Sequence, residues 1–120
     1  MANFLRHVGY ASEGIIYFFK TERNGRIQAV AAVVSIAAGF YFSISRIEWC
    51  IILGSVSLVI SLELVNTAIE RVCEMLSKEY HPMVKIIKDV AAGAVWWSAL
   101  FVAIIGILIF SPYVVEIFNS

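Results

Sequence analysis

Three long apolar segments dominate the pattern of hydrophobic and polar positions along the chain. Residues 27–45 and residues 90–110 contain no charged side chain. Between them, residues 49–62 are apolar or small, and the apolar positions keep a helical spacing to about Met75. A helix needs about 20 mainly apolar residues to cross the hydrocarbon core of a bilayer. The pattern therefore predicts three membrane-spanning helices, at about residues 27–45, 48–70 and 90–110.

The beginning of the chain has a different pattern, because charged side chains interrupt it. Its apolar positions recur at intervals of three and four and so share one side of a helix. These positions are Phe4, Val8, Ala11, Ile15 and Phe18. An amphipathic helix of this kind lies in the membrane interface, and we expect one over residues 1–20. Linkers are expected at residues 20–26, 46–48 and 77–88, with Pro82 marking a break before the last span.

Composition supports a membrane protein and excludes several classes of function. Of the 120 residues, 61% are hydrophobic and 15% are charged, which leaves too little polar sequence to cover three apolar helices in water. Nine Lys and Arg balance nine Asp and Glu, so the chain lacks the basic surface that nucleic-acid binding needs. We therefore expect an all-α integral membrane protein in which residues 1–120 form a single membrane-embedded domain.

The positions of Lys and Arg predict how the helices cross the membrane. Four precede the first span, one lies in the first turn, four lie in the second loop, and none follows the last span. Cytoplasmic segments carry an excess of Lys and Arg. The N-terminus and the second loop are therefore expected in the cytoplasm, and Ser120 is expected outside.

A polar face on the second predicted span carries the candidate chemistry. It consists of Glu63, Asn66, Thr67 and Glu70, which are spaced by three and four residues. A carboxylate inside a membrane costs about 3 kcal/mol and normally faces protein or water, so Glu63 is a functional candidate. The same face is also compatible with a packing hydrogen bond made by a protonated Glu63, or with an ion path in a small oligomeric channel or transporter subunit.

Further charged residues are expected at the same membrane face. The predicted topology places Glu22, Lys88 and Asp89 beside Glu70. Carboxylate oxygens with a nearby cation suit a magnesium-bound phosphate ester. The sequence contains no Walker A motif, so this site would not be a phosphate-binding loop of that type.

Several segments together resemble the prokaryotic diacylglycerol kinase family. They are ELVNTAIE at 63–70, KDVAAGAV at 88–95, EYH at 79–81, Glu22 in TERNGRI, and the Gly9-Tyr10 pair. The resemblance covers nearly the whole chain and includes the order of the helices. It implies an enzyme of the bacterial cytoplasmic membrane that transfers the γ-phosphate of ATP, with Mg²⁺, to a membrane lipid alcohol. It also implies a homotrimeric bundle with active sites shared between subunits.

The resemblance implies roles for individual residues as well. Glu63 matches the catalytic base of the family, with Asn66 beside it in the catalytic pair. Glu22 and Glu70 match the metal ligands, and Glu63 and Ala92 match positions at the lipid substrate. The positions that match the surroundings of ATP are Tyr10, Glu22, Glu70, Glu79, His81, Lys88 and Asp89.

Within the family, three segments look more like the undecaprenol kinase branch than the diacylglycerol branch. These are TERN at 21–24, GFYFSISRIEW at 39–49 and HPMVKIIKDVAAGAV at 81–95. Undecaprenol is therefore the expected lipid, with diacylglycerol as the nearest variant. Both lipids offer a primary hydroxyl group at the headgroup boundary, so the polar face itself does not distinguish them.

Overall fold

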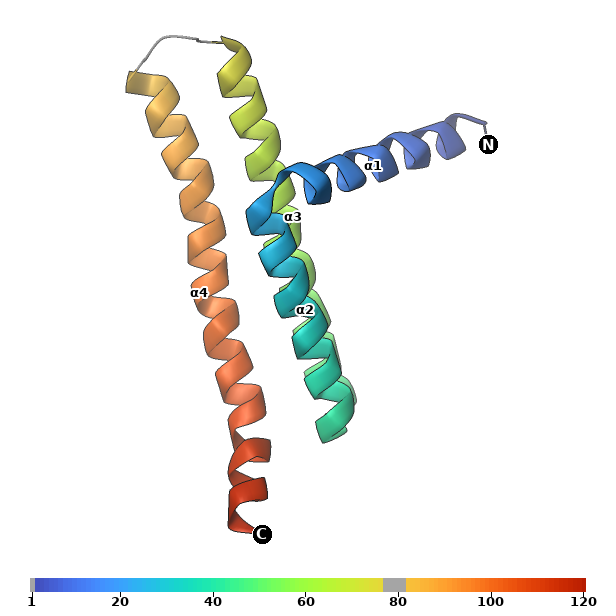
Figure 1. Ribbon diagram of the computed structural model, residues 1–120, viewed down its shortest axis with the longest axis vertical. Helices are drawn as coiled ribbons and strands as arrows, with labels where there is room; N and C mark the ends of the chain where they lie inside the picture. Colours follow the sequence, from blue (N-terminus) through green and yellow to red (C-terminus); the bar gives the residue numbers. More distant parts are fainter. Residues whose placement is uncertain (1, 77–81) are drawn as a thin grey trace.

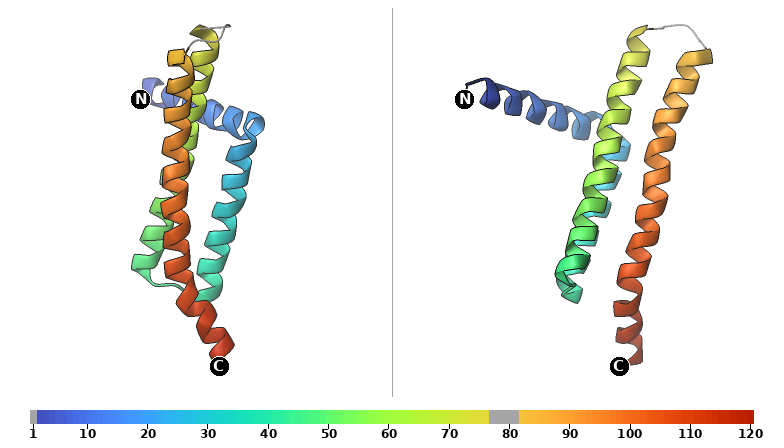
Figure 2. Two further views of the ribbon diagram at one scale, coloured as in Figure 1. Left: turned by 90° about the vertical axis from the view of Figure 1, so that its left-hand side faces the viewer. Right: turned by 180° about the vertical axis from the view of Figure 1, so that it is seen from behind.

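The computed structural model describes residues 2–76 and 82–120, and this part of the chain forms helices and no strand (Figure 1). The helices are α1 (Ala2–Thr21), α2 (Arg23–Phe42), α3 (Arg46–Leu76) and α4 (Pro82–Asn119). α2, α3 and α4 run alongside one another, whereas α1 leaves this bundle at a steep angle (Figure 2). The prediction of an all-α protein is confirmed for the described residues.

The bundle is organised around α3, which packs against both α4 and α2. α2, α3 and α4 are each long and apolar enough to cross a membrane. At about 1.5 Å per residue, α2 is about as long as the hydrocarbon core is thick, and the other two helices extend beyond it. Many large apolar side chains of these helices are exposed in the single chain. Such surfaces are suited to lipid or to other helices.

The linker predicted at residues 20–26 is wrong, because Glu22 alone separates α1 from α2. Its backbone is extended (φ −104°, ψ 114°), which is enough to turn the chain. Phe18 is 2% exposed and packs on Gly25, where an added Cβ atom would lie 2.5 Å from the ring. Helix α2 thus begins earlier than the predicted span, and the absence of a side chain at Gly25 leaves room for the ring of Phe18 on α1.

The turn predicted at residues 46–48 lies instead at residues 43–45, so α2 ends before residue 45. Ser43 adopts a left-handed conformation (φ 52°) that ends α2. The backbone N–H of Ser45 donates to Glu48 Oε1 at 2.9 Å, and the N–H of Glu48 donates to Ser45 Oγ at 3.2 Å. This reciprocal capping box begins α3 at Arg46, inside the segment predicted as a turn.

The last helix is longer than the span predicted at residues 90–110, and residues 82–88 of the predicted linker are helical. Pro82 occupies the first position of α4, where its missing N–H would have had no partner in any case. At the other end of α4, the hydroxyl of Tyr113 donates to Glu48. This contact joins the last part of α4 to the first turn of α3.

Candidate functional site

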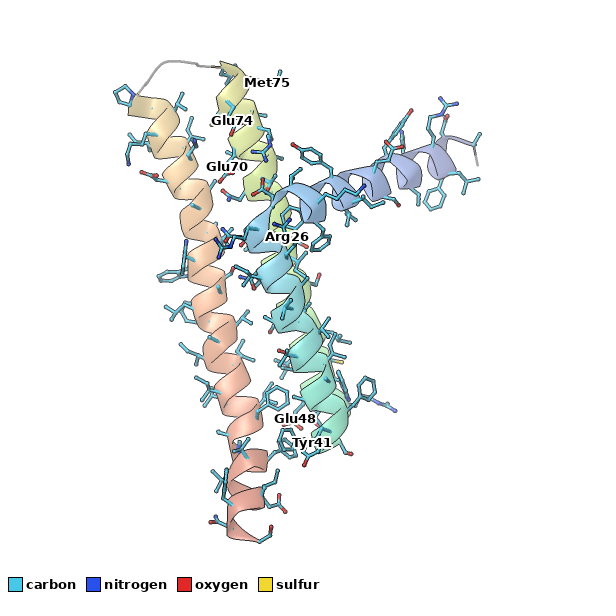
Figure 3. The ribbon with its side chains drawn as sticks, viewed as in Figure 1. Arg26, Tyr41, Glu48, Glu70, Glu74 and Met75 are labelled. Carbon is cyan, nitrogen blue, oxygen red and sulfur yellow. The ribbon has the colours of Figure 1, made fainter. Side chains whose placement is uncertain are left out.

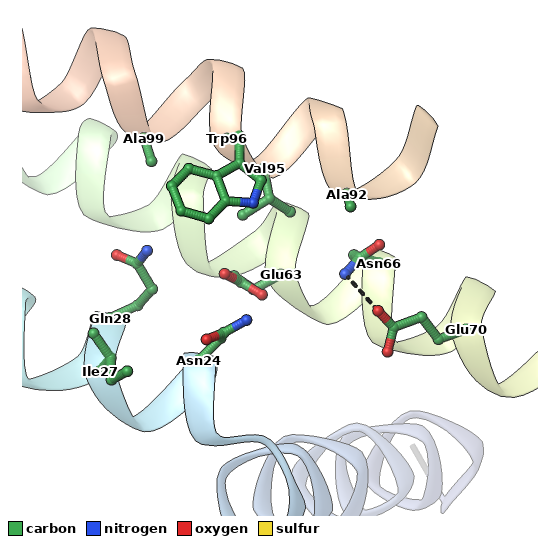
Figure 4. Close-up of a pocket in the computed structure, with 10 residues that line it drawn as sticks. All are labelled: Asn24, Ile27, Gln28, Glu63, Asn66, Glu70, Ala92, Val95, Trp96 and Ala99. Carbon is green, nitrogen blue, oxygen red and sulfur yellow. Dashed lines mark hydrogen bonds between the residues drawn. The ribbon is translucent and has the colours of Figure 1, made fainter. Parts of the chain in front are cut away.

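A cavity of about 280 Å³ lies between the first part of α2, the second half of α3 and the first part of α4 (Figure 4). Polar side chains line it from α2 and α3, whereas α4 contributes mainly apolar ones. Its lining consists of Asn24, Ile27, Gln28, Glu63, Asn66, Glu70, Ala92, Val95, Trp96 and Ala99. The cavity lies towards the end of the bundle that carries Glu70, and Glu48 marks the opposite end (Figure 3).

Glu63 lies at the centre of this cavity and is 4% exposed. Its carboxylate lies between the side chains of Asn24 and Trp96 (Figure 4). It makes no side-chain hydrogen bond with any residue that the structure describes, so a packing hydrogen bond made by Glu63 is absent there. Glu70 lines the same cavity. Glu63 is thus a buried acid that shares its cavity with a second acid.

Asn66 and Glu70 continue the polar lining along α3. Asn66 Nδ2 donates to Glu70 Oε1 at 3.2 Å, while Asn66 Oδ1 is buried without a hydrogen-bond partner. Thr67 was predicted on the same face and is buried, but it does not line the cavity. The structure therefore brings together Glu63, Asn66 and Glu70, as the spacing along α3 predicted.

The oxygen atoms of this lining are suited to a metal ion that arrives with its substrate. Within residues 2–76 and 82–120, no three acidic, His or Cys side chains are arranged to enclose a metal ion. Mg²⁺ does not need such a cage, since it is commonly held by one or two carboxylates together with substrate phosphates and water. Glu70 and the unpartnered Oδ1 of Asn66 supply donors of this kind. The residues present thus fit Mg²⁺ bound with a phosphate substrate.

Glu22 has a partner that the sequence did not suggest. Its carboxylate forms an ion pair with the guanidinium of Arg71 on α3. Arg71 also donates from Nε to the hydroxyl of Tyr17 at 3.1 Å and from Nη1 to Glu74 Oε1 at 3.4 Å. A role of Glu22 as a metal ligand therefore requires this ion pair to open.

The other residues predicted around ATP that the structure describes do not line the cavity. Lys88 and Asp89 are exposed near the beginning of α4, and Asp89 accepts a hydrogen bond from Lys85 Nζ at 2.5 Å. Tyr10 lies on α1 and is 60% exposed. Two further predicted positions fall outside the described residues: Glu79 and His81. The structure thus gathers the predicted catalytic pair, one predicted metal ligand and Ala92. The other described candidates do not line the cavity; they are Tyr10, Glu22, Lys88 and Asp89.

Comparison with known proteins decides between the functional classes that the polar face left open. The sequence model of the prokaryotic diacylglycerol kinase family matches residues 9–110. The chain belongs to the prokaryotic diacylglycerol kinase family. It is therefore a membrane lipid kinase. The polar lining between three apolar helices is explained by this activity, and a channel or transporter is not favoured.

Named relatives agree with the diacylglycerol kinase family. The chain is 42% identical over 109 residues to the undecaprenol kinase of Bacillus subtilis. The aligned part makes up 91% of this chain and 89% of that protein. It is 38% identical over 105 residues to a diacylglycerol kinase of Synechocystis, covering 87% of this chain and 60% of that protein. It is 29% identical over 101 residues to the diacylglycerol kinase of Escherichia coli, and the aligned part makes up 84% of this chain and 82% of that protein.

Of the residues lining the cavity of this kinase that sequence reasoning missed, three carry a polar side-chain group: Asn24, Gln28 and Trp96. Asn24 and Gln28 are four residues apart on α2, which places them on one side of that helix. Gln28 is the one amide side chain within predicted span 27–45, a signal that could have been used. Trp96 gave no signal, because an aromatic residue in an apolar span is most often a packing residue.

Proposed function

We propose that this protein transfers the γ-phosphate of ATP to the hydroxyl group of a membrane lipid alcohol, and that undecaprenol is its best substrate, ahead of diacylglycerol. The observation that carries the proposal is the buried Glu63 carboxylate, which has no hydrogen-bond partner among the described residues and faces a cavity with Asn66 and Glu70. A carboxylate that is buried and has no hydrogen-bond partner is suited to accept a proton. The names of the relatives support the lipid class, since they are undecaprenol and diacylglycerol kinases.

Glu63 is the general base of the proposed reaction. The lipid hydroxyl lies within hydrogen-bond reach of its carboxylate, in the cavity that Ala92 lines from α4. The carboxylate accepts the hydroxyl proton while the hydroxyl oxygen attacks the γ-phosphorus of ATP in line, and ADP leaves. The product is undecaprenyl phosphate, or phosphatidic acid when diacylglycerol reacts. Asn66 holds the neighbouring acid in place through its hydrogen bond to Glu70.

Glu70 and Glu22 are the proposed ligands of Mg²⁺. When bound, this ion neutralises charge on the phosphates of ATP and so favours attack by an oxygen atom. Glu70 accepts a hydrogen bond from Asn66 that fixes the orientation of its carboxylate. Lys88 adds a positive charge for the phosphates. The remaining positions that we place around the nucleotide are Tyr10, Glu79, His81 and Asp89.

Charge and shape support the proposed placement in the bacterial cytoplasmic membrane. Because Lys and Arg are concentrated in residues 6–26 and 71–88, we place the N-terminus in the cytoplasm and the C-terminus outside. The cavity then opens near the side of the membrane where ATP is present. We also place α1 in the membrane interface, since it is amphipathic and leaves the bundle at a steep angle (Figure 1).

We further propose that the active enzyme is a homotrimer with sites shared between subunits. One chain has three spanning helices, and these expose much of their apolar surface. Small side chains on α2 and α4 would allow close approach of neighbouring helices; they include Ala29, Ala31, Ala32, Ala91, Ala92, Gly93 and Ala94. Neighbouring subunits would then enclose ATP and lipid more fully than one chain can.

The experiment that tests this function is phosphorylation of a lipid panel by the purified protein. Labelled ATP is supplied with undecaprenol, diacylglycerol or ceramide at matched surface concentration in one detergent, because these substrates are confined to micelles. We expect kcat/KM for undecaprenol to exceed that for diacylglycerol by about tenfold or more, the effect of one or two good contacts. Equal or greater efficiency on diacylglycerol would overturn the choice of lipid. Absence of phosphorylation with all three lipids would refute the proposal.

A further inference from the structure

Arg71 ties the junction between α1 and α2 to α3. Its guanidinium forms an ion pair with Glu22, the residue that separates α1 from α2. Its Nε donates to the hydroxyl of Tyr17 on α1 at 3.1 Å, and its Nη1 donates to Glu74 on α3 at 3.4 Å. One cation therefore contacts three segments at the border of the proposed active site.

Within the part of the chain that the structure describes, the acids of the site have no other directly bound counter-charge. Glu63 and Glu70 line one cavity, and Glu22 is paired with Arg71, the residue that follows Glu70 on α3, so three carboxylates lie in one region of the bundle. Like charges in such surroundings repel one another more strongly than they do in water. Of the ion pairs found within residues 2–76 and 82–120, only the one between Arg71 and Glu22 involves any of these three acids.

We propose that Arg71 is a resident counter-cation, which neutralises Glu22 while the nucleotide site is empty and releases it when Glu22 binds the metal ion of the incoming nucleotide. This inference rests on the proposed function, because it takes Glu22 as a metal ligand. Arg71 is then a positioning residue, since it acts through Glu22 and sets how readily this carboxylate changes its partner.

The contacts around the ion pair allow this exchange to stay local. The side chains of Arg71 and Glu22 are 35% and 21% exposed, so water reaches both partners. After release, Arg71 keeps its hydrogen bonds to Tyr17 and Glu74. The backbone N–H of Glu22 donates to the carbonyl of Phe18 at 2.8 Å, so the backbone of Glu22 is held by a hydrogen bond that does not involve Arg71.

Binding of Mn²⁺ tests this role without catalysis. Electron paramagnetic resonance is used to follow Mn²⁺ binding to the purified full-length protein with saturating β,γ-imido-ATP. Arg71→Gln removes the competing cation, and we expect half-saturation at a Mn²⁺ concentration about threefold to fivefold lower than in the wild type, the range for a partly exposed ion pair. A residue that only supports the fold would weaken Mn²⁺ binding or leave it unchanged.

Arg23→Gln is the matched control. It removes one positive charge from the residue next to Glu22, yet Arg23 forms no ion pair or side-chain hydrogen bond with the part of the chain that the structure describes. We expect less than about a twofold change in Mn²⁺ half-saturation, because a screened surface charge has a small effect. An equal gain in both variants would overturn the inference, since it would be an effect of net charge alone.

A double-mutant cycle checks that Arg71 acts through Glu22. In a Glu22→Gln background, Arg71→Gln should leave Mn²⁺ half-saturation unchanged. If Arg71→Gln does not assemble, Arg71→Met removes the charge with an unbranched apolar side chain and has the same expected gain. Weaker or unchanged Mn²⁺ binding in an assembled variant would overturn the inference but not the kinase function. Failure of the wild type to bind Mn²⁺ with the nucleotide analogue would overturn both.

Discussion

Replacement of Glu63 by Gln tests the centre of the proposed mechanism. Gln has nearly the same size and shape as Glu, but its amide group cannot accept the proton of the lipid hydroxyl. Glu63 makes no side-chain hydrogen bond within the described part of the chain, so the substitution removes no such contact between helices. The variant should therefore insert and assemble as the wild type does while losing the base.

The burial of Glu63 sets the size of the expected effect. Because this residue is 4% exposed, water has little access to its position and cannot readily replace the base. A general base contributes about 10²-fold to 10⁴-fold, which corresponds to about 2.7 to 5.4 kcal/mol of activation free energy. We expect kcat to fall by at least about a hundredfold. The KM for ATP should change by less than about threefold, because the lost interaction belongs to the transition state.

The assay is the initial rate of undecaprenol phosphorylation in mixed micelles, with assembly checked by size-exclusion chromatography. Glu116→Gln is the matched control, because it makes the same chemical change at an exposed carboxylate on the last part of α4. This control should keep its rate within about twofold of the wild type. The assignment of Glu63 as the base is wrong if Glu63→Gln keeps more than about a tenth of the wild-type kcat.

Three further changes test other parts of the structure. Gly25→Ala places a methyl group 2.5 Å from a buried aromatic ring and should lower the thermal unfolding midpoint, with a loss of about 1–3 kcal/mol in stability. Glu70→Ala should raise the Mg²⁺ concentration for half-maximal activity at least about tenfold, because a carboxylate ligand is lost. With the native cysteines replaced, a cysteine at Lys85 should react with an impermeant maleimide only from the cytoplasm, and one at Ser120 only from outside.

For each of these three predictions, a specific outcome would contradict the reasoning. Gly14→Ala adds the same methyl group to a position where, apart from the adjoining residues and backbone of α1 itself, no heavy atom lies within 4 Å, so an equal loss of stability at Gly14 and Gly25 would contradict the packing argument. An unchanged Mg²⁺ requirement would remove Glu70 from the proposed metal site. Labelling of both introduced cysteines from one side would contradict the crossing of the membrane by α4.

The order of the helices was predictable, whereas their ends were not. A bilayer demands long apolar segments, so the three spans appear directly in the hydrophobic pattern. A helix does not end where its apolar segment ends, because its backbone hydrogen bonds form equally well outside the lipid. Residues 82–88 are helical for this reason, although they lie outside the uncharged segment. The capping box of Ser45 and Glu48 could have placed the first turn correctly, since it is a local sequence signal.

In the candidate site, too, some features were predictable from the sequence and others were not. Glu63, Asn66 and Glu70 lie on one helix, so their spacing was enough to predict that they share a face. The ion pair between Glu22 and Arg71 joins residues that are 49 positions apart. It depends on how α1 and α2 pack on α3, which no local pattern in the sequence specifies.

The ion pair between Arg71 and Glu22 joins the start of α2 to α3 and also lies at the proposed metal site. Between membrane helices the hydrophobic effect contributes little, so packing and polar contacts decide how they are arranged. At one end of the bundle, Tyr113 bonds to Glu48 and joins α4 to α3. At the other end, Arg71 joins α3 to Tyr17 and Glu22. Because Glu22 takes part in both the junction and the proposed metal site, binding of the nucleotide would remove one of the contacts that join α1 to α3, whereas the hydrogen bond between Arg71 and Tyr17 would remain and keep α1 in place.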